Sequence, residues 1–201
     1  MLNEHREKFK SLSIKVGVLF SRIPLTPNQW TLLSIVPAIV ASWLISQNQF
    51  FSAAVFFAAA SFLDFVDGSV ARVTGRVTKF GAYLDTILDR YVEFLAIAGL
   101  FYATLPMVFL SAKEWLLFYL FGSMMTTYAK AAAKEKEITQ AEIKGGFFER
   151  AERLIILFIG LLLAATQDTA FLVMTVILLA AITNLSALQR IFIVAKLASK
   201  S

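Results

Sequence analysis

Four aspartates recur at helical spacing inside two hydrophobic segments, and they are the side chains of this sequence best suited to chemistry. Asp64 and Asp67 are three residues apart, and Asp85 and Asp89 are four apart, so each pair shares one face of a helix. A charged side chain at the centre of a membrane helix costs about 2.5–3.5 kcal/mol on insertion scales. Hard divalent cations take oxygen ligands, so two such faces turned together predict a metal-binding cage of four carboxylates.

The aspartates belong to a longer pattern with fixed spacing, D-x2-D-G-x2-A-R-x8-G-x3-D-x3-D. Its defined positions are Asp64, Asp67, Gly68, Ala71, Arg72, Gly81, Asp85 and Asp89. The pattern resembles the signature of the CDP-alcohol phosphotransferases, a family that makes membrane phospholipids, and every defined position matches. The resemblance implies transfer of a substituted phosphate from a CDP-linked lipid to an alcohol, with release of CMP. The alternative without catalysis is a cation or lipid transporter with a carboxylate site, although no internal repeat is visible.

The composition is that of an integral membrane protein. The chain has 201 residues, of which 58% are hydrophobic, and its mean hydropathy is +0.71, whereas soluble domains are about 45–50% apolar. Cysteine is absent and His5 is the only histidine, which excludes thiolate or histidine metal clusters. The net charge of +5 indicates membrane topology and anionic lipid headgroups in such a protein, and we expect no nucleic-acid partner.

Six segments are long and apolar enough to be transmembrane helices. They cover residues 29–47, 50–70, 81–104, 112–131, 150–167 and 169–195. A helix satisfies its own backbone hydrogen bonds in lipid, so the sequence predicts an all-α integral membrane protein with six spans.

The basic residues divide the links between these segments into two sets. Only Lys113 falls among the links at residues 46–49, around Pro106 and at residues 166–169, and every other Lys and Arg lies with the opposite set. Positive charge accumulates on the cytoplasmic side of membrane proteins. We therefore expect a multi-pass protein of the cell membrane, with both termini and the active site facing the cytoplasm.

The N-terminal segment has the pattern of an amphipathic helix over residues 3–21. Its proposed apolar face consists of Phe9, Leu12, Val16, Leu19 and Phe20, and its basic residues are Arg6, Lys8, Lys10 and Lys15. This pattern is typical of a helix at the membrane interface, and the alternative is a helix packed on cytoplasmic loops. Two regions are predicted, an amphipathic juxtamembrane segment at 1–27 and the transmembrane domain at 28–201. Thr26 is the expected N-cap of the first span, with Pro27 at its first position.

The resemblance also implies a nucleotide site. The segment T-P-N-Q-W-T resembles the family segment that borders the nucleotide pocket, which makes Asn28 and Thr31 candidates, although helix capping alone would explain it. In the family, the positions that correspond to Gly68, Ala71 and Gly81 line the cytidine site. Asp67 and Arg72 are further candidates for binding the donor. The small residues allow a ligand to come close, or allow tight helix packing in the membrane.

For catalysis the resemblance implies two Mg²⁺ or Mn²⁺ ions per active site. Asp64, Asp67 and Asp85 would be the core ligands, and Asp89 would serve as the general base and also as a possible ligand. Metals held in this way clamp a pyrophosphate and stabilise the leaving CMP, and all-oxygen ligands suit these two ions. Glu93 lies one turn beyond Asp89, where it would extend the polar wall or pair with a basic residue of another helix.

A second stretch points to the acceptor alcohol. The residues K-G-G-F-F-E-R-A-E-R at 144–153 resemble a segment of phosphatidylinositol phosphate and archaetidylinositol phosphate synthases, as do Tyr128–Ala131 and Gln189–Arg190. Ala132 departs from the pattern, because the family often has a second basic residue there. The resemblance implies an inositol phosphate acceptor and a homodimer, and glycerol 3-phosphate is the alternative acceptor.

The phosphate of such an acceptor needs several cations, with arginine best for bidentate contact. The candidates are Lys130, Arg150, Arg153 and Arg190. Arg190 interrupts an apolar segment, so it should face the interior or the cytoplasmic mouth. For Arg150 and Arg153 the alternative is salt bridging with Glu149 and Glu152.

Overall fold

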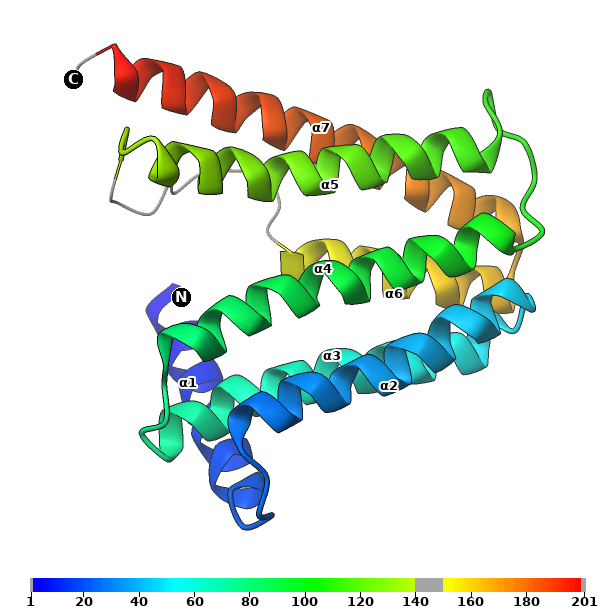
Figure 1. Cartoon of the computed structure of the whole chain (residues 1–201). Coiled ribbons are helices and arrows are strands. Elements are labelled where there is room, and N and C mark those ends of the chain that lie inside the picture. Colours follow the sequence, from blue (N-terminus) through cyan, green and yellow to red (C-terminus); the bar gives the residue numbers. More distant parts are fainter. Residues whose placement is uncertain (1, 140–149, 200–201) are drawn as a thin grey trace. The chain divides into compact units, whose positions relative to one another are not determined.

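The chain is all-helical in the computed structural model, which describes residues 2–139 and 150–199 (Figure 1). Its helices are α1 Leu2–Phe20, α2 Pro27–Ser46, α3 Phe50–Val73, α4 Lys79–Tyr102, α5 Ala112–Glu135, α6 Arg150–Thr166 and α7 Thr169–Ala198. The part of the chain that is described contains no β-strand. Helices α2 to α7 correspond one to one with the six predicted segments, with ends that differ by at most four residues.

Helices α2, α3 and α7 are long and apolar enough, by length and composition, to cross a membrane. Helix α4 carries Asp85, Asp89, Arg90 and Glu93, and α5 is less apolar than α2, α3 and α7. Helix α6 is described from Arg150 onwards, directly after residues that the structure does not describe.

The chain forms two compact units. The N-terminal unit contains residues Met1–Leu44 and Ser52–Ala96, and the C-terminal unit contains residues Ile45–Phe51 and Ile97–Ser201. The signature therefore lies entirely within the N-terminal unit. All four predicted acceptor-binding cations lie within the C-terminal unit.

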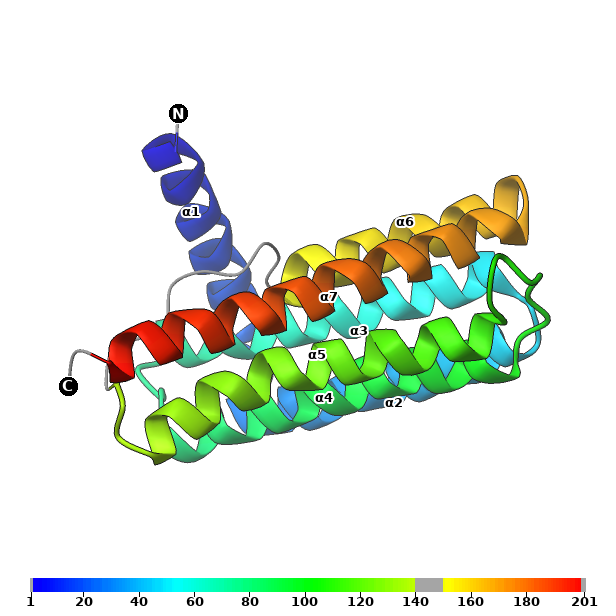
Figure 2. The ribbon, with the colours of Figure 1, turned by 90° about the horizontal axis from the view of Figure 1, so that it is seen from above.

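In the N-terminal unit, α1 crosses the ends of α2 and α3 at a steep angle (Figures 1 and 2). Val16 and Phe20 of α1 pack against a buried cluster of Trp30, Val66 and Val70. The predicted apolar face of α1 is thus divided, because Leu12 and Leu19 are 52% and 60% exposed. The side chain of Phe9, which was assigned to the same face, lies outside the described residues.

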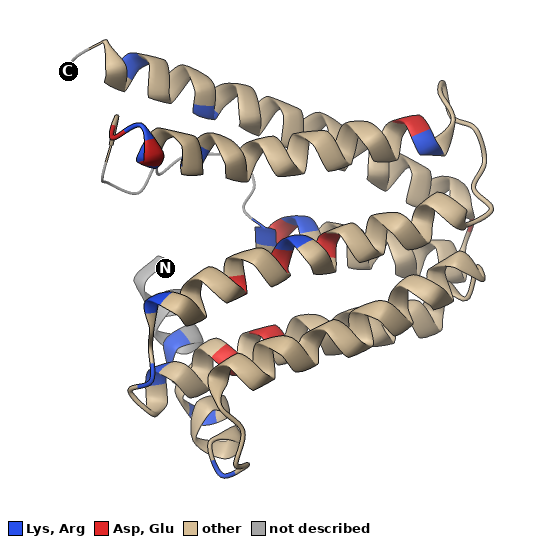
Figure 3. Ribbon diagram, in the orientation of Figure 1, with Lys and Arg blue, Asp and Glu red and all other residues tan. Residues whose placement is uncertain are grey.

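The turn between α3 and α4 brings the two halves of the signature together. Gly75 ends α3 with a φ of +67°, a conformation in which a side chain would be strained, and Arg76 N donates to the Ala71 carbonyl at 3.0 Å, as in a Schellman motif. Thr78 then caps α4, because its hydroxyl accepts from Gly81 N at 3.0 Å. The chain reverses within five residues, and the four signature aspartates of α3 and α4 lie in the helix halves nearest this turn, where Figure 3 shows acidic positions on both helices.

The predicted start of α2 is confirmed. Pro27 is its first residue, and Thr26 forms a capping box with Gln29: the Thr26 hydroxyl accepts from Gln29 N at 3.3 Å, and Thr26 N donates to the Gln29 side chain at 2.7 Å. This arrangement satisfies backbone donors at the helix start. It also fixes the start of α2, whose first two turns carry Asn28 and Thr31.

In the C-terminal unit, α7 packs along both α5 and α6. Two glycines allow the close approach. A β-carbon at Gly122 of α5 would stand 2.4 Å from the Thr183 hydroxyl, and one at Gly160 of α6 would stand 2.7 Å from the Thr175 methyl group. Such small-residue contacts are typical of membrane helix packing.

Candidate active site

Three signature carboxylates converge in the N-terminal unit. Asp64 and Asp67 come from α3 and Asp85 comes from α4, and one oxygen of each lies within 4.8 Å of the others. Asp67 is only 5% exposed. Its Oδ2 atom has no hydrogen-bond partner among the described residues.

This donor set fits a hard divalent cation. Three carboxylates so close together repel one another when ionised, and a buried carboxylate oxygen without a hydrogen bond is costly. A cation between them removes both penalties. The group contains neither sulfur nor imidazole, so its chemistry suits Mg²⁺ or Mn²⁺ rather than Zn²⁺.

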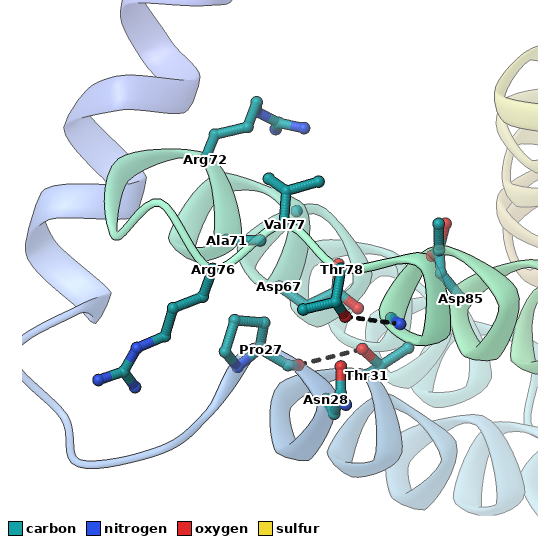
Figure 4. Close-up of a pocket in the computed structure, with 13 residues that line it drawn as sticks. Pro27, Asn28, Thr31, Asp67, Ala71, Arg72, Arg76, Val77, Thr78 and Asp85 are labelled. Atoms are coloured by element: carbon teal, nitrogen blue, oxygen red, sulfur yellow. Dashed lines mark hydrogen bonds between the residues drawn. The ribbon is translucent and has the colours of Figure 1, made fainter.

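A cavity of about 340 Å³ opens beside this cluster (Figure 4). It is lined by Pro27, Asn28, Thr31, Asp67, Gly68, Ala71, Arg72, Arg76, Val77, Thr78, Gly81, Ala82 and Asp85. Every residue that the sequence predicts for the nucleotide site is among them. The cavity is therefore bordered by the first turn of α2 and by the signature halves of α3 and α4.

Sequence reasoning missed Arg76, Val77 and Thr78, which also line the cavity. They fall between the defined signature positions, in the turn that joins α3 to α4. A short link between two helices that carry one site must border that site. These three residues could therefore have been predicted from their position in the link, although not from their residue types.

The two signature glycines leave space for neighbouring side chains. A β-carbon at Gly81 would lie 3.0 Å from the Asn28 amide oxygen and 3.0 Å from the Thr78 hydroxyl. A β-carbon at Gly68 would lie 3.1 Å from Nη1 of Arg72. The absence of a side chain at each glycine therefore lets polar side chains that line the cavity come close to the helix backbone.

Asp89 and Glu93 continue the polar face of α4. Asp89 is half-buried and is not a member of the three-carboxylate group. Glu93 is 2% exposed, and its Oε2 atom lies 2.8 Å from Nη1 of Arg90. Glu93 thus forms an ion pair within α4, and pairing with a basic residue of another helix stays a prediction.

The four predicted acceptor-binding cations occupy three helices of the C-terminal unit. Arg153 and Arg190 are 2% and 4% exposed, while Lys130 and Arg150 are half-buried. Arg190 of α7 donates through Nη1 to the main-chain carbonyl of Thr126 on α5, so it faces the interior as predicted. Residues 144–149 of the predicted acceptor segment lie outside the described residues.

Curated relatives match most of the chain. It is 33% identical to the archaetidylinositol phosphate synthase of Pyrococcus horikoshii over 177 residues, covering 86% of this chain and 88% of that one. It is 36% identical to the phosphatidylinositol phosphate synthase of Corynebacterium glutamicum, covering 80% of this chain and 74% of that one.

Solved structures agree with these relatives. The Mycobacterium tuberculosis phosphatidylinositol phosphate synthase in complex with manganese and citrate matches with a TM-score of 0.79 and 27% identity, covering 90% of this chain and 88% of that one. The same enzyme with CDP-DAG bound matches with a TM-score of 0.77 and 26% identity, covering 92% and 94%. A sequence model of the family described as CDP-alcohol phosphatidyltransferase matches residues 24–196. The chain therefore belongs to the CDP-alcohol phosphatidyltransferase family.

Proposed function

We propose that this membrane enzyme transfers the phosphatidyl-type group of a CDP-linked lipid to inositol phosphate and releases CMP. The observation that carries the proposal is the convergence of Asp64, Asp67 and Asp85 beside a cavity lined by the rest of the signature. The curated relatives that match most of the chain are named for inositol phosphate products of this kind, and a CDP-DAG complex is known for a structural relative.

Asp64, Asp67 and Asp85 would hold Mg²⁺ or Mn²⁺, with two ions per site as in the sequence-based expectation. When bound, these cations supply charge neutralisation for a pyrophosphate and for the departing CMP oxygen. The carboxylates keep this charge at one end of the cavity. The nucleotide would occupy the remainder, where Gly68 and Gly81 carry no side chain.

Asn28, Thr31 and Ala71 would form the walls around the nucleotide, and Arg72 would contact a phosphate of the donor. Asn28 and Thr31 are presented by the capped start of α2, which limits their movement. Figure 4 shows Arg72 and Arg76 extending to different sides of the cavity. Arg76, a cation not anticipated from the sequence, would add positive potential at the cavity mouth.

Asp89 would accept the proton of the acceptor hydroxyl. The acceptor oxygen then forms a bond to the lipid-side phosphorus, while the bond from this phosphorus to the CMP oxygen breaks. Asp89 suits this role because it lies one turn from Asp85 on α4 yet outside the group of three carboxylates.

Lys130, Arg150, Arg153 and Arg190 would bind the phosphate of the acceptor. Two of them, Arg153 and Arg190, are almost fully buried, and arginine is the cation best suited to buried ion pairs and to phosphate recognition. Inositol phosphate and glycerol 3-phosphate share this phosphate. The relatives' names favour inositol phosphate.

We also propose that α2 to α7 all span the cell membrane, as one transmembrane domain at 28–201 preceded by a juxtamembrane segment at 1–27. The exposed Leu12, Ile14, Val18 and Leu19 of α1 would face the apolar part of the membrane interface. The distribution of Lys and Arg supports a cytoplasmic active site and cytoplasmic termini. A homodimer is expected by analogy with the family.

Turnover of a CDP-linked lipid against a panel of acceptors tests the proposal. CMP release should require inositol phosphate, and it should be weak or absent with glycerol 3-phosphate, inositol or serine. Faster release with glycerol 3-phosphate would assign the acceptor to that alcohol. The use of CDP-diacylglycerol and CDP-archaeol in parallel identifies the lipid tail.

A further inference from the structure

We infer that Ser13 of α1 is a positioning residue for Arg72, so that the juxtamembrane helix is a working part of the donor site. This inference rests on the proposed function, because it concerns the same cavity. It assigns α1 a role beyond membrane attachment, and it concerns contacts that lie wholly within the N-terminal unit.

The contacts form a small network of one cation and two hydroxyls. Nη2 of Arg72 donates to the Ser13 hydroxyl at 2.9 Å and to the Ser69 hydroxyl at 3.3 Å. The two hydroxyl oxygens are 2.9 Å apart. A guanidinium donates hydrogen bonds and cannot accept them, so both serines present lone pairs to Arg72 while one hydroxyl donates to the other.

The two serines belong to the interior although Arg72 does not. Ser13 and Ser69 are 6% and 0% exposed, whereas Arg72 is exposed overall. Hydrogen bonds in a buried setting are stronger and more directional than those in water. The guanidinium of a long, flexible side chain is therefore attached to a rigid point on the junction of α1 and α3.

Helix α1 must sit very close to α3 for this contact to form. A β-carbon at Gly17 would stand 2.5 Å from the Ser69 carbonyl oxygen and 2.6 Å from the Val73 side chain. Gly17 follows Ser13 by four residues, so both lie on the same face of α1. The glycine sets the distance between the helices, and the serine uses that distance to reach Arg72.

The other end of the guanidinium lies against the cavity. Nη1 of Arg72 would be 3.1 Å from a β-carbon at Gly68, and both Arg72 and Gly68 line the cavity. Arg72 is thus held between a hydroxyl of α1 and the bare backbone of the signature. Fixing its conformation before the donor binds lowers the entropy cost of binding.

Ser13→Ala tests the inference, with Ser11→Ala as the matched control because Ser11 is exposed on the same helix. We expect Ser13→Ala to raise the KM for CDP-diacylglycerol about three- to tenfold, the loss of one hydrogen bond to a charged group that keeps a second partner. The acceptor KM should not change. Binding of CDP in the presence of Mn²⁺, measured by calorimetry, should weaken by a similar factor.

Two further variants separate positioning from packing. Ser13→Cys keeps a similar volume but forms weaker hydrogen bonds, so it should behave like Ser13→Ala. In an Arg72→Ala background, Ser13→Ala should have no additional effect on the CDP-diacylglycerol KM. An undiminished effect in that background, or a Ser13→Cys protein with wild-type KM, would overturn the inference.

Failure of the Ser13 role and failure of the proposed function give different results. A wild-type protein that turns over CDP-diacylglycerol while Ser13→Ala and Ser11→Ala are indistinguishable from it contradicts the inference alone. A wild-type protein that neither binds CDP nor releases CMP contradicts the proposed function, and the inference falls with it.

Discussion

Arg190 of α7 donates a hydrogen bond to the main-chain carbonyl of Thr126 on α5, so a predicted acceptor-binding cation is also anchored to its neighbouring helix. The side chain is 4% exposed. One nitrogen of its guanidinium group therefore forms a hydrogen bond within the protein. A role in stability and a role in binding therefore have to be separated by experiment.

Arg190→Ala should raise the apparent KM for inositol phosphate. Loss of a charge-assisted hydrogen bond costs about 1.5–3 kcal/mol of binding free energy, which corresponds to roughly a ten- to hundredfold fall in kcat/KM. The KM for the CDP-lipid should change little, because the proposed donor site consists of the signature residues. Lys196→Ala is the control, since it removes an exposed cation from the same helix, and thermal unfolding in detergent reports the structural part. An unchanged acceptor KM in a folded Arg190→Ala protein would place the phosphate pocket elsewhere.

Asp67→Asn should abolish turnover and weaken Mn²⁺ binding. The change replaces a buried carboxylate, whose Oδ2 atom has no hydrogen-bond partner among the described residues, with a neutral amide. Asp64→Asn and Asp85→Asn should have the same effect, because the three oxygens form one group. Asp168→Asn is the matched control, since this aspartate caps α7 and asparagine caps equally well. Calorimetric titration with Mn²⁺ is the measurement, and unaltered binding in Asp67→Asn would remove the residue from the metal site.

Gly81→Ala should weaken donor binding with little effect on folding. The new β-carbon would lie 3.0 Å from the Asn28 and Thr78 side chains, which must give way by a few tenths of an ångström. Because these side chains line the cavity, CDP-lipid binding should fall while the melting temperature is nearly unchanged. Thr86→Ala is the control on an exposed face of α4, where the threonine hydroxyl only donates to its own helix. Equal donor affinity in the two variants would show that this wall does not contact the donor.

Asp89→Asn should separate chemistry from binding. If Asp89 is the general base, the rate should fall by on the order of 10² to 10⁴ while CDP-lipid binding persists. Asp64→Asn provides the comparison, because it should lose metal and donor binding together. Equal losses of CDP-lipid affinity in Asp89→Asn and Asp64→Asn would make Asp89 a metal ligand first.

The helices and the carboxylate cluster could be predicted from the sequence because both depend on spacing along a helix. Three- and four-residue spacing places Asp64 with Asp67 and Asp85 with Asp89 on single faces, and the short link between the two segments brings the faces together. The same spacing could not show how far along α4 the cluster extends. The four-carboxylate cage that it predicted includes Asp89, whereas the observed group contains only the oxygens of Asp64, Asp67 and Asp85.

Contacts between distant segments could not be predicted from the sequence. Ser13 and Arg72 are 59 residues apart, and no periodicity links a serine of a surface helix to an arginine of the signature. The sequence pattern assigned Leu12 and Leu19 to the same apolar face as Val16, yet the docked face of α1 is set by Gly17, whose missing side chain admits α3.

The most direct test of the account is transfer of labelled inositol phosphate into a lipid-extractable product by the purified protein. With CDP-diacylglycerol or CDP-archaeol and added Mg²⁺ or Mn²⁺, we predict that labelled lipid accumulates in step with CMP. We predict that chelation of the metal, or Asp67→Asn, stops both. Labelled lipid formed at the wild-type rate after exhaustive chelation, or CMP released without any labelled lipid, would contradict the account.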